Sequence, residues 1–191
     1  QEDLAYAQGF SLVYSNCNGF ADRELPKLKA AGIPIAFDFS DRWTPDYLQA
    51  TLPWVDIALL SCSHLPAGQR EEVLAQALHL GARIAVATAG QEGSWVLWEG
   101  KLFHAPAARA AQVVDTMGAG DAYFAAFLCS LLKTAGEEGL FARDLSHRIP
   151  QAMGQAAAYA AQTCALEGAF GGGVTLAGRT ELTPLEKDLS L

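Results

Sequence analysis

The clearest chemical signal in the sequence is a short polar turn, Asp115-Thr-Met-Gly-Ala-Gly-Asp121. Apolar side chains follow it at helical spacing, beginning at Phe124, so we expect the turn to open a helix. The free N–H groups in the first turn of a helix attract anions by hydrogen bonding and by the helix dipole. Phosphoryl transfer concentrates negative charge on the transferred group, and such a set of donors would stabilise it.

Two carboxylates flank this turn. Asp121 is placed to accept a proton from an attacking hydroxyl, as a general base would. Asp115 stands across the turn, where it could serve a cation or brace the loop. The simpler alternative is that Asp121 only caps its helix.

The elements that must position these groups follow from the hydrophobic pattern. Short apolar runs alternate with amphipathic segments, which predicts a mainly parallel sheet covered by helices on both faces. The expected strands are residues 11–15, 33–37, 54–60 and 83–88, and the expected helices are residues 21–31, 44–51 and 67–80. Residues 94–98 and 101–104 form an expected hairpin around Glu99-Gly100, and a last long helix covers residues 146–166. The tail from Gly171 onward is expected to be loop.

Ligands of open α/β sheets lie beyond the carboxyl ends of the strands. Polar residues that directly follow expected strands are therefore candidates for a site. They fall in four segments, residues 38–42, 61–64, 88–93 and 115–121.

Composition limits the class of protein. The 191 residues suffice for a single domain with a sizeable hydrophobic core. We expect the main part of this domain to be about residues 10–172. A net charge of −8 argues against a general nucleic-acid surface, and no apolar run approaches the length of a membrane span. The four cysteines are far apart and the four histidines are scattered, so we expect a reducing cytoplasm and no metal cluster of histidines.

The turn and the residues after it carry a resemblance to a known family. Asp-Thr-x-Gly-Ala-Gly-Asp, followed by an aromatic residue and Ala-Ala-Phe-Leu, resembles the C-terminal signature of the ribokinase (PfkB-type) family of sugar kinases. The resemblance implies a three-layer α/β/α sandwich that uses ATP and Mg²⁺. It makes Asp121 the base that deprotonates a sugar hydroxyl. The backbone of Gly118, Ala119 and Gly120 would form the anion hole.

Two other segments fit the same resemblance. Thr88-Ala-Gly90-Gln-Glu-Gly93 resembles the Thr-x-Gly-x-x-Gly turn that lies against the phosphates and ribose of ATP in this family. The segment from Asp38 to Arg42 resembles an Asp-x-Asn-x-Arg segment that faces the substrate and phosphates, with Ser40 in place of the Asn.

A third segment, Leu166-Glu-Gly168-Ala169, resembles the Gly-Ala turn after the last long helix of the family. The family often places adenine contacts there, together with backbone ligands for a monovalent cation such as K⁺. By this resemblance Gly168 would contact the nucleotide, and Asp115 would assist the cation.

The sequence departs from the family pattern at Ser61-Cys-Ser-His64, where an Asn-x-x-Glu motif commonly helps to organise Mg²⁺. Either the metal is held through water and phosphate alone, or the chain belongs to a divergent branch. The segments Ala36–Trp43 and Asp115–Asp121 are most similar to the fructoselysine 6-kinase branch. This implies a sugar or sugar derivative as the substrate.

The resemblance covers about residues 10–172, which corresponds to the C-terminal two-thirds of a family member. The N-terminal strands, the Gly-Gly sugar-binding segment and the β lid have no counterpart here, so we expect the chain to be a portion of a kinase. Family members often form dimers through the lid, which makes a homodimer possible.

Two alternatives from other classes remain to be weighed. A dinucleotide-binding oxidoreductase would use Gly118-x-Gly120 as its phosphate turn, but Tyr123 stands where the third glycine is required. A non-catalytic, kinase-like nucleotide-binding or regulatory module is suggested by the loss of the metal motif at Ser61–His64.

Overall fold

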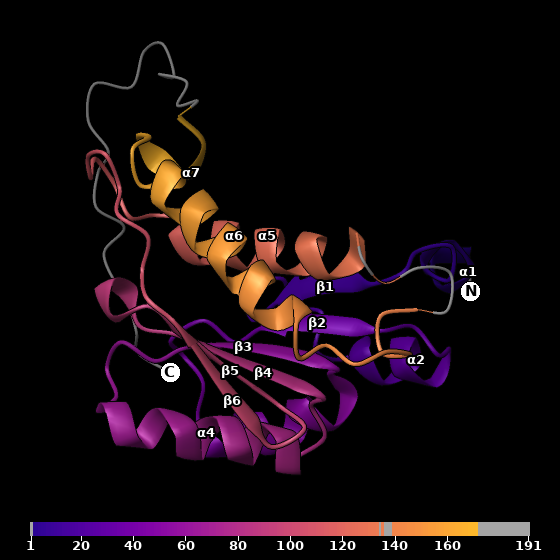
Figure 1. The fold of residues 1–191 in the computed structure, drawn as a ribbon. Helices are drawn as coiled ribbons and strands as arrows, with labels where there is room; N and C mark the ends of the chain where they lie inside the picture. The colour runs from indigo at the N-terminus through magenta and orange to yellow at the C-terminus, as the bar shows by residue number, and fades with distance from the viewer. Residues whose placement is uncertain (1, 134, 136–138, 172–191) are drawn as a thin grey trace, which may run out of the picture.

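The computed structural model describes residues 2–133, 135 and 139–171. It contains a six-stranded sheet whose strands lie in the order of the sequence, β1 to β6 (Figure 1). The strands are β1 (Val13–Asn16), β2 (Ile35–Asp38), β3 (Ile57–Ser61), β4 (Ile84–Thr88), β5 (Ser94–Trp98) and β6 (Lys101–Ala105). The helices are α1 (Glu2–Ala7), α2 (Leu25–Ala30), α3 (Pro45–Thr51), α4 (Ala67–His79), α5 (Ala119–Lys133), α6 (Arg148–Thr163) and α7 (Gly168–Gly171), with 3₁₀ turns η1 (Leu52–Trp54) and η2 (Gly90–Glu92).

The connections between strands explain the layers. β1 to β4 are parallel, and each crossover steps in the same direction across the sheet. Right-handed crossovers that all step one way place their helices on the same face. β5 and β6 then turn back as antiparallel strands, and α5 and α6 return over the opposite face (Figure 1).

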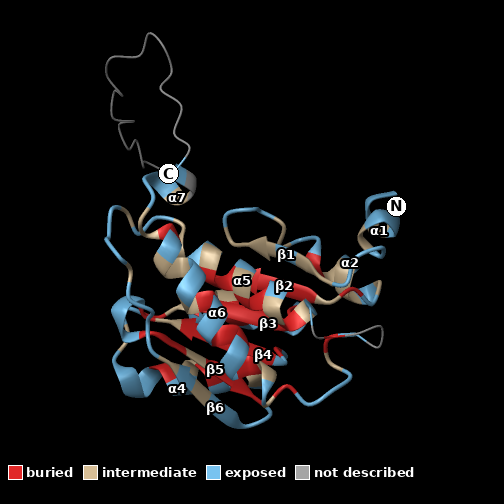
Figure 2. Ribbon diagram, turned by 45° about the horizontal axis from the view of Figure 1, so that its top comes forward, coloured by how far each residue is buried: buried red, intermediate tan, exposed pale blue. Residues whose placement is uncertain are grey.

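Each face of the sheet has its own hydrophobic core. Alternate strand residues such as Ala36 and Leu59 pack with Phe124 and Phe127 of α5 and with Met153 of α6. The intervening residues, including Phe37 and Leu60, pack with Leu74 of α4. The middle strands are therefore buried on both sides, whereas the outer surfaces of the helices are exposed (Figure 2). This confirms the expected three-layer arrangement.

Local sequence signals explain where several elements begin and end. The hydroxyl of Thr44 caps α3 by accepting from the Tyr47 N–H, and Pro45 occupies the first helical position. Glu99 and Gly100 both have positive φ angles, as a tight hairpin between twisted strands requires. The predicted hairpin is confirmed with its second strand extended to Ala105.

Several expected elements begin or end at other residues in the structure. The helix expected from residue 21 begins at Leu25, and the strand expected over residues 54–60 covers Ile57–Ser61 because Leu52–Trp54 form a 3₁₀ turn. The last long helix ends at Thr163, and the short helices α1 and α7 were not expected. The loop predicted from Gly171 onward lies outside the described residues except for Gly171 itself, which is the last residue of α7. Among the helices of the described part of the chain, none is long and apolar enough to cross a membrane.

Candidate active site

The predicted residues gather where the parallel strands end. Asp38 is the last residue of β2, Thr88 is the last residue of β4, and Asp121 lies in the first turn of α5. β1 and β2 pair so that Tyr14 lies opposite Ala36 and Asn16 opposite Asp38. Because alternate strand residues share a face, Asp38 is on the same face as Ala36, which packs under α5. The sheet therefore presents Asp38 to the start of that helix.

Asp121 is exposed, and among the described residues its side chain has one hydrogen-bond partner, Tyr14. The Tyr14 hydroxyl donates to Oδ1 of Asp121 at 3.3 Å. The Tyr14 ring also makes an edge contact with the ring of Phe124, with 5.5 Å between centroids. No sequence pattern points to Tyr14, because only the pairing of β1 with β2 and the packing of α5 bring it to this place.

Asp38 is a buried carboxyl group, with 8% of the residue exposed. Its pKa is raised to about 6, chiefly by burial and also by the negative charge of Asp121. The Ser40 N–H donates to Oδ1 of Asp38 at 2.7 Å and opposes the shift. Ser40 itself has a φ of 55°, a left-handed conformation that Asn tolerates better than most residues.

The glycine turn leaves several backbone donors available. The Ala119 N–H donates to the Thr116 carbonyl at 3.2 Å. Within the described part of the chain, the N–H groups of Gly118, Gly120 and Asp121 donate to no protein atom. These groups, at the positive end of a 15-residue helix, suit an anion. The part played by Ala119 in an anion hole stays a prediction.

Asp115 braces the loop, which is one of the two roles considered for it. Its Oδ1 accepts from the Met117 N–H at 2.9 Å, and its Oδ2 accepts from the Gly168 N–H at 3.1 Å. Gly118 has a φ of 75°, and a Cβ there would lie 2.5 Å from the Cβ of Ala169. The Gly-Ala turn at the start of α7 is thus held directly against the turn that opens α5. Binding of a cation by Asp115 stays a prediction.

The turn after β4 is held by a buried arginine that the sequence analysis missed. Arg70 of α4 donates from Nη1 and Nη2 to the two carboxylate oxygens of Glu92, at 2.8 and 2.7 Å. The Arg70 side chain is 3% exposed and that of Glu92 is 58% exposed. Gly93 is needed for close packing, since a Cβ there would lie 2.2 Å from the Ala105 carbonyl oxygen. Gly90 is exposed, with a φ of 53°.

The segment Ser61–His64, in the place of the family's metal motif, contains no carboxylate. The Trp43 indole N–H donates to the Ser61 carbonyl at 3.2 Å, and the Trp43 ring lies 5.4 Å from the His64 ring. No cluster of three or more His, Cys, Asp or Glu side chains suited to a metal occurs among the described residues. The side chains at this edge therefore do not fit a direct Mg²⁺ site. Arg42 is exposed in the loop after β2.

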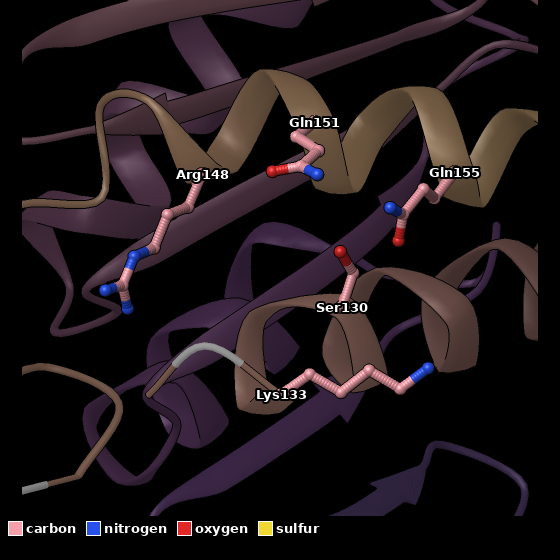
Figure 3. A pocket seen from close by; sticks show the side chains of 5 residues that line it. All are labelled: Ser130, Lys133, Arg148, Gln151 and Gln155. Atoms are coloured by element: carbon pink, nitrogen blue, oxygen red, sulfur yellow. The ribbon is translucent and has the colours of Figure 1, made fainter. Parts of the chain in front are cut away.

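A hollow lined by residues with polar side chains lies elsewhere, between α5 and α6 (Figure 3). Its lining residues come from the later part of α5 and the earlier part of α6. They are Ser130, Lys133, Arg148, Gln151 and Gln155. Ser130 is eleven residues beyond Ala119, or about 16 Å along the helix, so the hollow is separate from the gathered residues.

Comparison with known proteins identifies the family of the chain. The family described as pfkB family carbohydrate kinase matches residues 1–171. The chain belongs to this family.

Relatives in sequence are sugar-derivative kinases. Fructoselysine 6-kinase of Escherichia coli is 35% identical over 174 residues, which cover 89% of this chain and 60% of the relative. The fructosamine kinase FrlD of Bacillus subtilis is 31% identical over 173 residues, covering 91% of this chain and 56% of the relative. This pfkB-family chain thus spans about 60% of the length of the curated relatives it matches.

Solved structures support the fold. The ribokinase of Giardia lamblia matches with a TM-score of 0.75 and 20% identity, covering 88% of this chain and 57% of that one. A ribokinase of Arabidopsis thaliana in complex with ribose and ATP matches with a TM-score of 0.68 and 22% identity, covering 88% and 54%. The pfkB-family chain therefore has a ribokinase-like fold.

Proposed function

We propose that the chain carries the catalytic part of an ATP-dependent phosphotransferase that acts on a hydroxyl of a sugar or sugar derivative. The observation that carries the proposal is the position of Asp121. It is an exposed carboxylate in the first turn of α5, beside backbone donors that have no protein acceptor in the described part of the chain. A base next to an anion site is what phosphoryl transfer to an alcohol requires.

In the proposed reaction, Asp121 accepts the hydroxyl proton while the hydroxyl oxygen attacks the γ-phosphorus of ATP. The bond from that phosphorus to the β–γ bridging oxygen breaks, and ADP leaves. The N–H groups of Gly118, Gly120 and Asp121 hold the oxygens of the transferred phosphate. Asp38 faces the substrate hydroxyl group, and Arg42 supplies positive charge for the phosphates.

The nucleotide would lie along the turns beside this centre. We assign Thr88, Gly90 and Gly93 to its phosphates and ribose, and Gly168 to its adenine. Mg²⁺ would come bound to ATP, which agrees with the lack of a fitting protein ligand set among the described residues. The loop at Asp115 is where K⁺ could bind through backbone carbonyls.

The relatives support a proposal for the substrate class. Those at 31–36% identity are named fructoselysine 6-kinase and fructosamine kinase, which favours a glycated amine as the phosphoryl acceptor.

We place the reaction in the cytoplasm, which is consistent with four cysteines that form no disulfide. A homodimer also remains a proposal.

A second candidate is a kinase-like module that binds nucleotide without catalysis. The observation that favours it is the segment Ser61–His64, which lacks the family's metal-organising carboxylate. This module would bind ATP and form no phosphorylated product.

The test is Asp121→Asn in the full-length protein, assayed with fructoselysine, fructose and ribose. Loss of a general base lowers turnover by about 10²- to 10⁴-fold, so we expect kcat to fall by that factor with ATP affinity retained. Asp3→Asn on α1, at the other end of the sheet, is the control for the change of charge. Unchanged turnover in Asp121→Asn would remove the base role, and wild-type protein that binds ATP but phosphorylates no sugar would favour the second candidate.

A further inference from the structure

Tyr14 connects the edge of the sheet to the start of α5. It lies on β1, at the edge of the sheet, and 39% of the residue is exposed. Its ring rests edge-on against Phe124, so the phenol is directed along the start of α5. The hydroxyl reaches Asp121, which is 107 residues away in the sequence. The contact between the two rings orients the Tyr14 side chain so that its hydroxyl can reach the Asp121 carboxylate.

Burial and nearby negative charges keep the Tyr14 hydroxyl protonated, so that it can donate a hydrogen bond. Burial raises its pKa well above the ordinary value, and the negative charges of Asp38 and Asp121 raise it further. The phenol is therefore protonated throughout the physiological range. Among the described residues, no other group donates a hydrogen bond to the Asp121 side chain.

We propose that Tyr14 is a positioning residue for the catalytic base: its hydroxyl holds Oδ1 of Asp121 and leaves Oδ2 to receive the proton of the substrate. This inference rests on the proposed function and names a further residue of the same site. A carboxylate in the first turn of a helix can rotate about its side-chain bonds. Restraining one oxygen reduces that freedom, which brings the other oxygen to the substrate more often.

The hydrogen bond between the Tyr14 hydroxyl and Oδ1 of Asp121 is 3.3 Å long, which is long for O–H···O geometry. We therefore expect a moderate effect on turnover when the hydroxyl is removed. The groups that face Asp121 from neighbouring elements are Tyr14 of β1 and Asp38 of β2. Cys17, which follows β1, lies near Asp38, and its pKa is raised by burial and then by that charge.

Tyr14→Phe in the full-length protein tests the proposal, because it keeps the ring contact with Phe124 and removes only the hydroxyl. We expect kcat for sugar phosphorylation to fall by about 5- to 20-fold, as for a lost orienting contact, with KM for ATP unchanged. Tyr159→Phe, an exposed tyrosine on α6, is the matched control and leaves both quantities unchanged.

A second measurement separates this proposal from the proposed function. The carbon-13 chemical shift of the Asp121 carboxyl carbon at neutral pH reports the hydrogen bond without any turnover. Asp121→Asn identifies the signal, because it removes this carboxyl group. A chemical shift that is identical in wild type and Tyr14→Phe would overturn the positioning role. A changed chemical shift together with unchanged turnover in Asp121→Asn would retain the contact and reject Asp121 as the base.

Discussion

Asp38 illustrates how burial changes the chemistry of a single residue. Its pKa rises from 3.8 to about 6, so the folded protein binds the proton more tightly than the unfolded chain. Raising the pH from 4 to 6 ionises the unfolded chain first, which favours unfolding. Above the pKa of about 6 in the folded protein, the full free-energy cost of ionising the buried Asp38 carboxyl group destabilises the fold. A shift of about two units corresponds to roughly 3 kcal/mol as an upper limit.

The residue-scale prediction uses Asp38→Asn, which keeps an oxygen acceptor for the Ser40 N–H and cannot ionise. Relative to wild type, this variant should gain about 2–3 kcal/mol of unfolding free energy as the pH rises from 4 to 7. Urea unfolding at several pH values measures the difference. Asp41→Asn, an exposed carboxylate in the same loop, is the control. A difference between Asp38→Asn and wild type that does not change with pH would contradict the prediction.

At the scale of elements, the start of α5 and the start of α7 form one unit. Asp115 accepts from Gly168, and the Cys164 carbonyl at the end of α6 accepts from the N–H groups of Val114 and Asp115. Gly118 lies against Ala169 with no room for a side chain. The anion-binding turn is therefore held from behind by the turn after α6.

Gly118→Ala should disturb this unit. The new methyl group would clash with Ala169, and the positive φ is strained for alanine, so we expect a loss of about 2–4 kcal/mol. Gly120→Ala is the stability control, because a Cβ there has open space and alanine favours a helix. Thermal unfolding compares the two. Equal effects of the two substitutions would show that the contact with Ala169 does not constrain the turn.

At the scale of the whole molecule, we expect the central strands of the sheet to be better protected from hydrogen exchange than the edge strands. β3 is paired on both sides and almost fully buried, whereas β6 lies at an edge and is partly exposed. Hydrogen exchange of the backbone should therefore be slowest in β3 and β4, and about 10²-fold or more faster in β6, where local opening suffices. Exchange measured by NMR or mass spectrometry checks this order. Equal protection of β3 and β6 would indicate that only global unfolding exposes the sheet.

The elements and the main turn follow from the sequence because their signals are local. The hairpin depends on Glu99-Gly100, and the helix after Asp121 depends on apolar residues at helical spacing. The family signature is likewise one contiguous segment, so it is readable without a structure. The ends of elements were less well predicted, as at Leu52–Trp54, where a 3₁₀ turn replaces the expected start of a strand.

The polar turn from Asp115 to Asp121 was determined by the sequence alone, together with the kind of chemistry it favours. Only the tertiary structure decided which groups surround it. The contact of Tyr14 with Asp121 and the bond from Gly168 to Asp115 join residues 107 and 53 positions apart. Such contacts depend on strand register and on how helices pack over the sheet, and these are set by the burial of the whole core rather than by neighbouring residues.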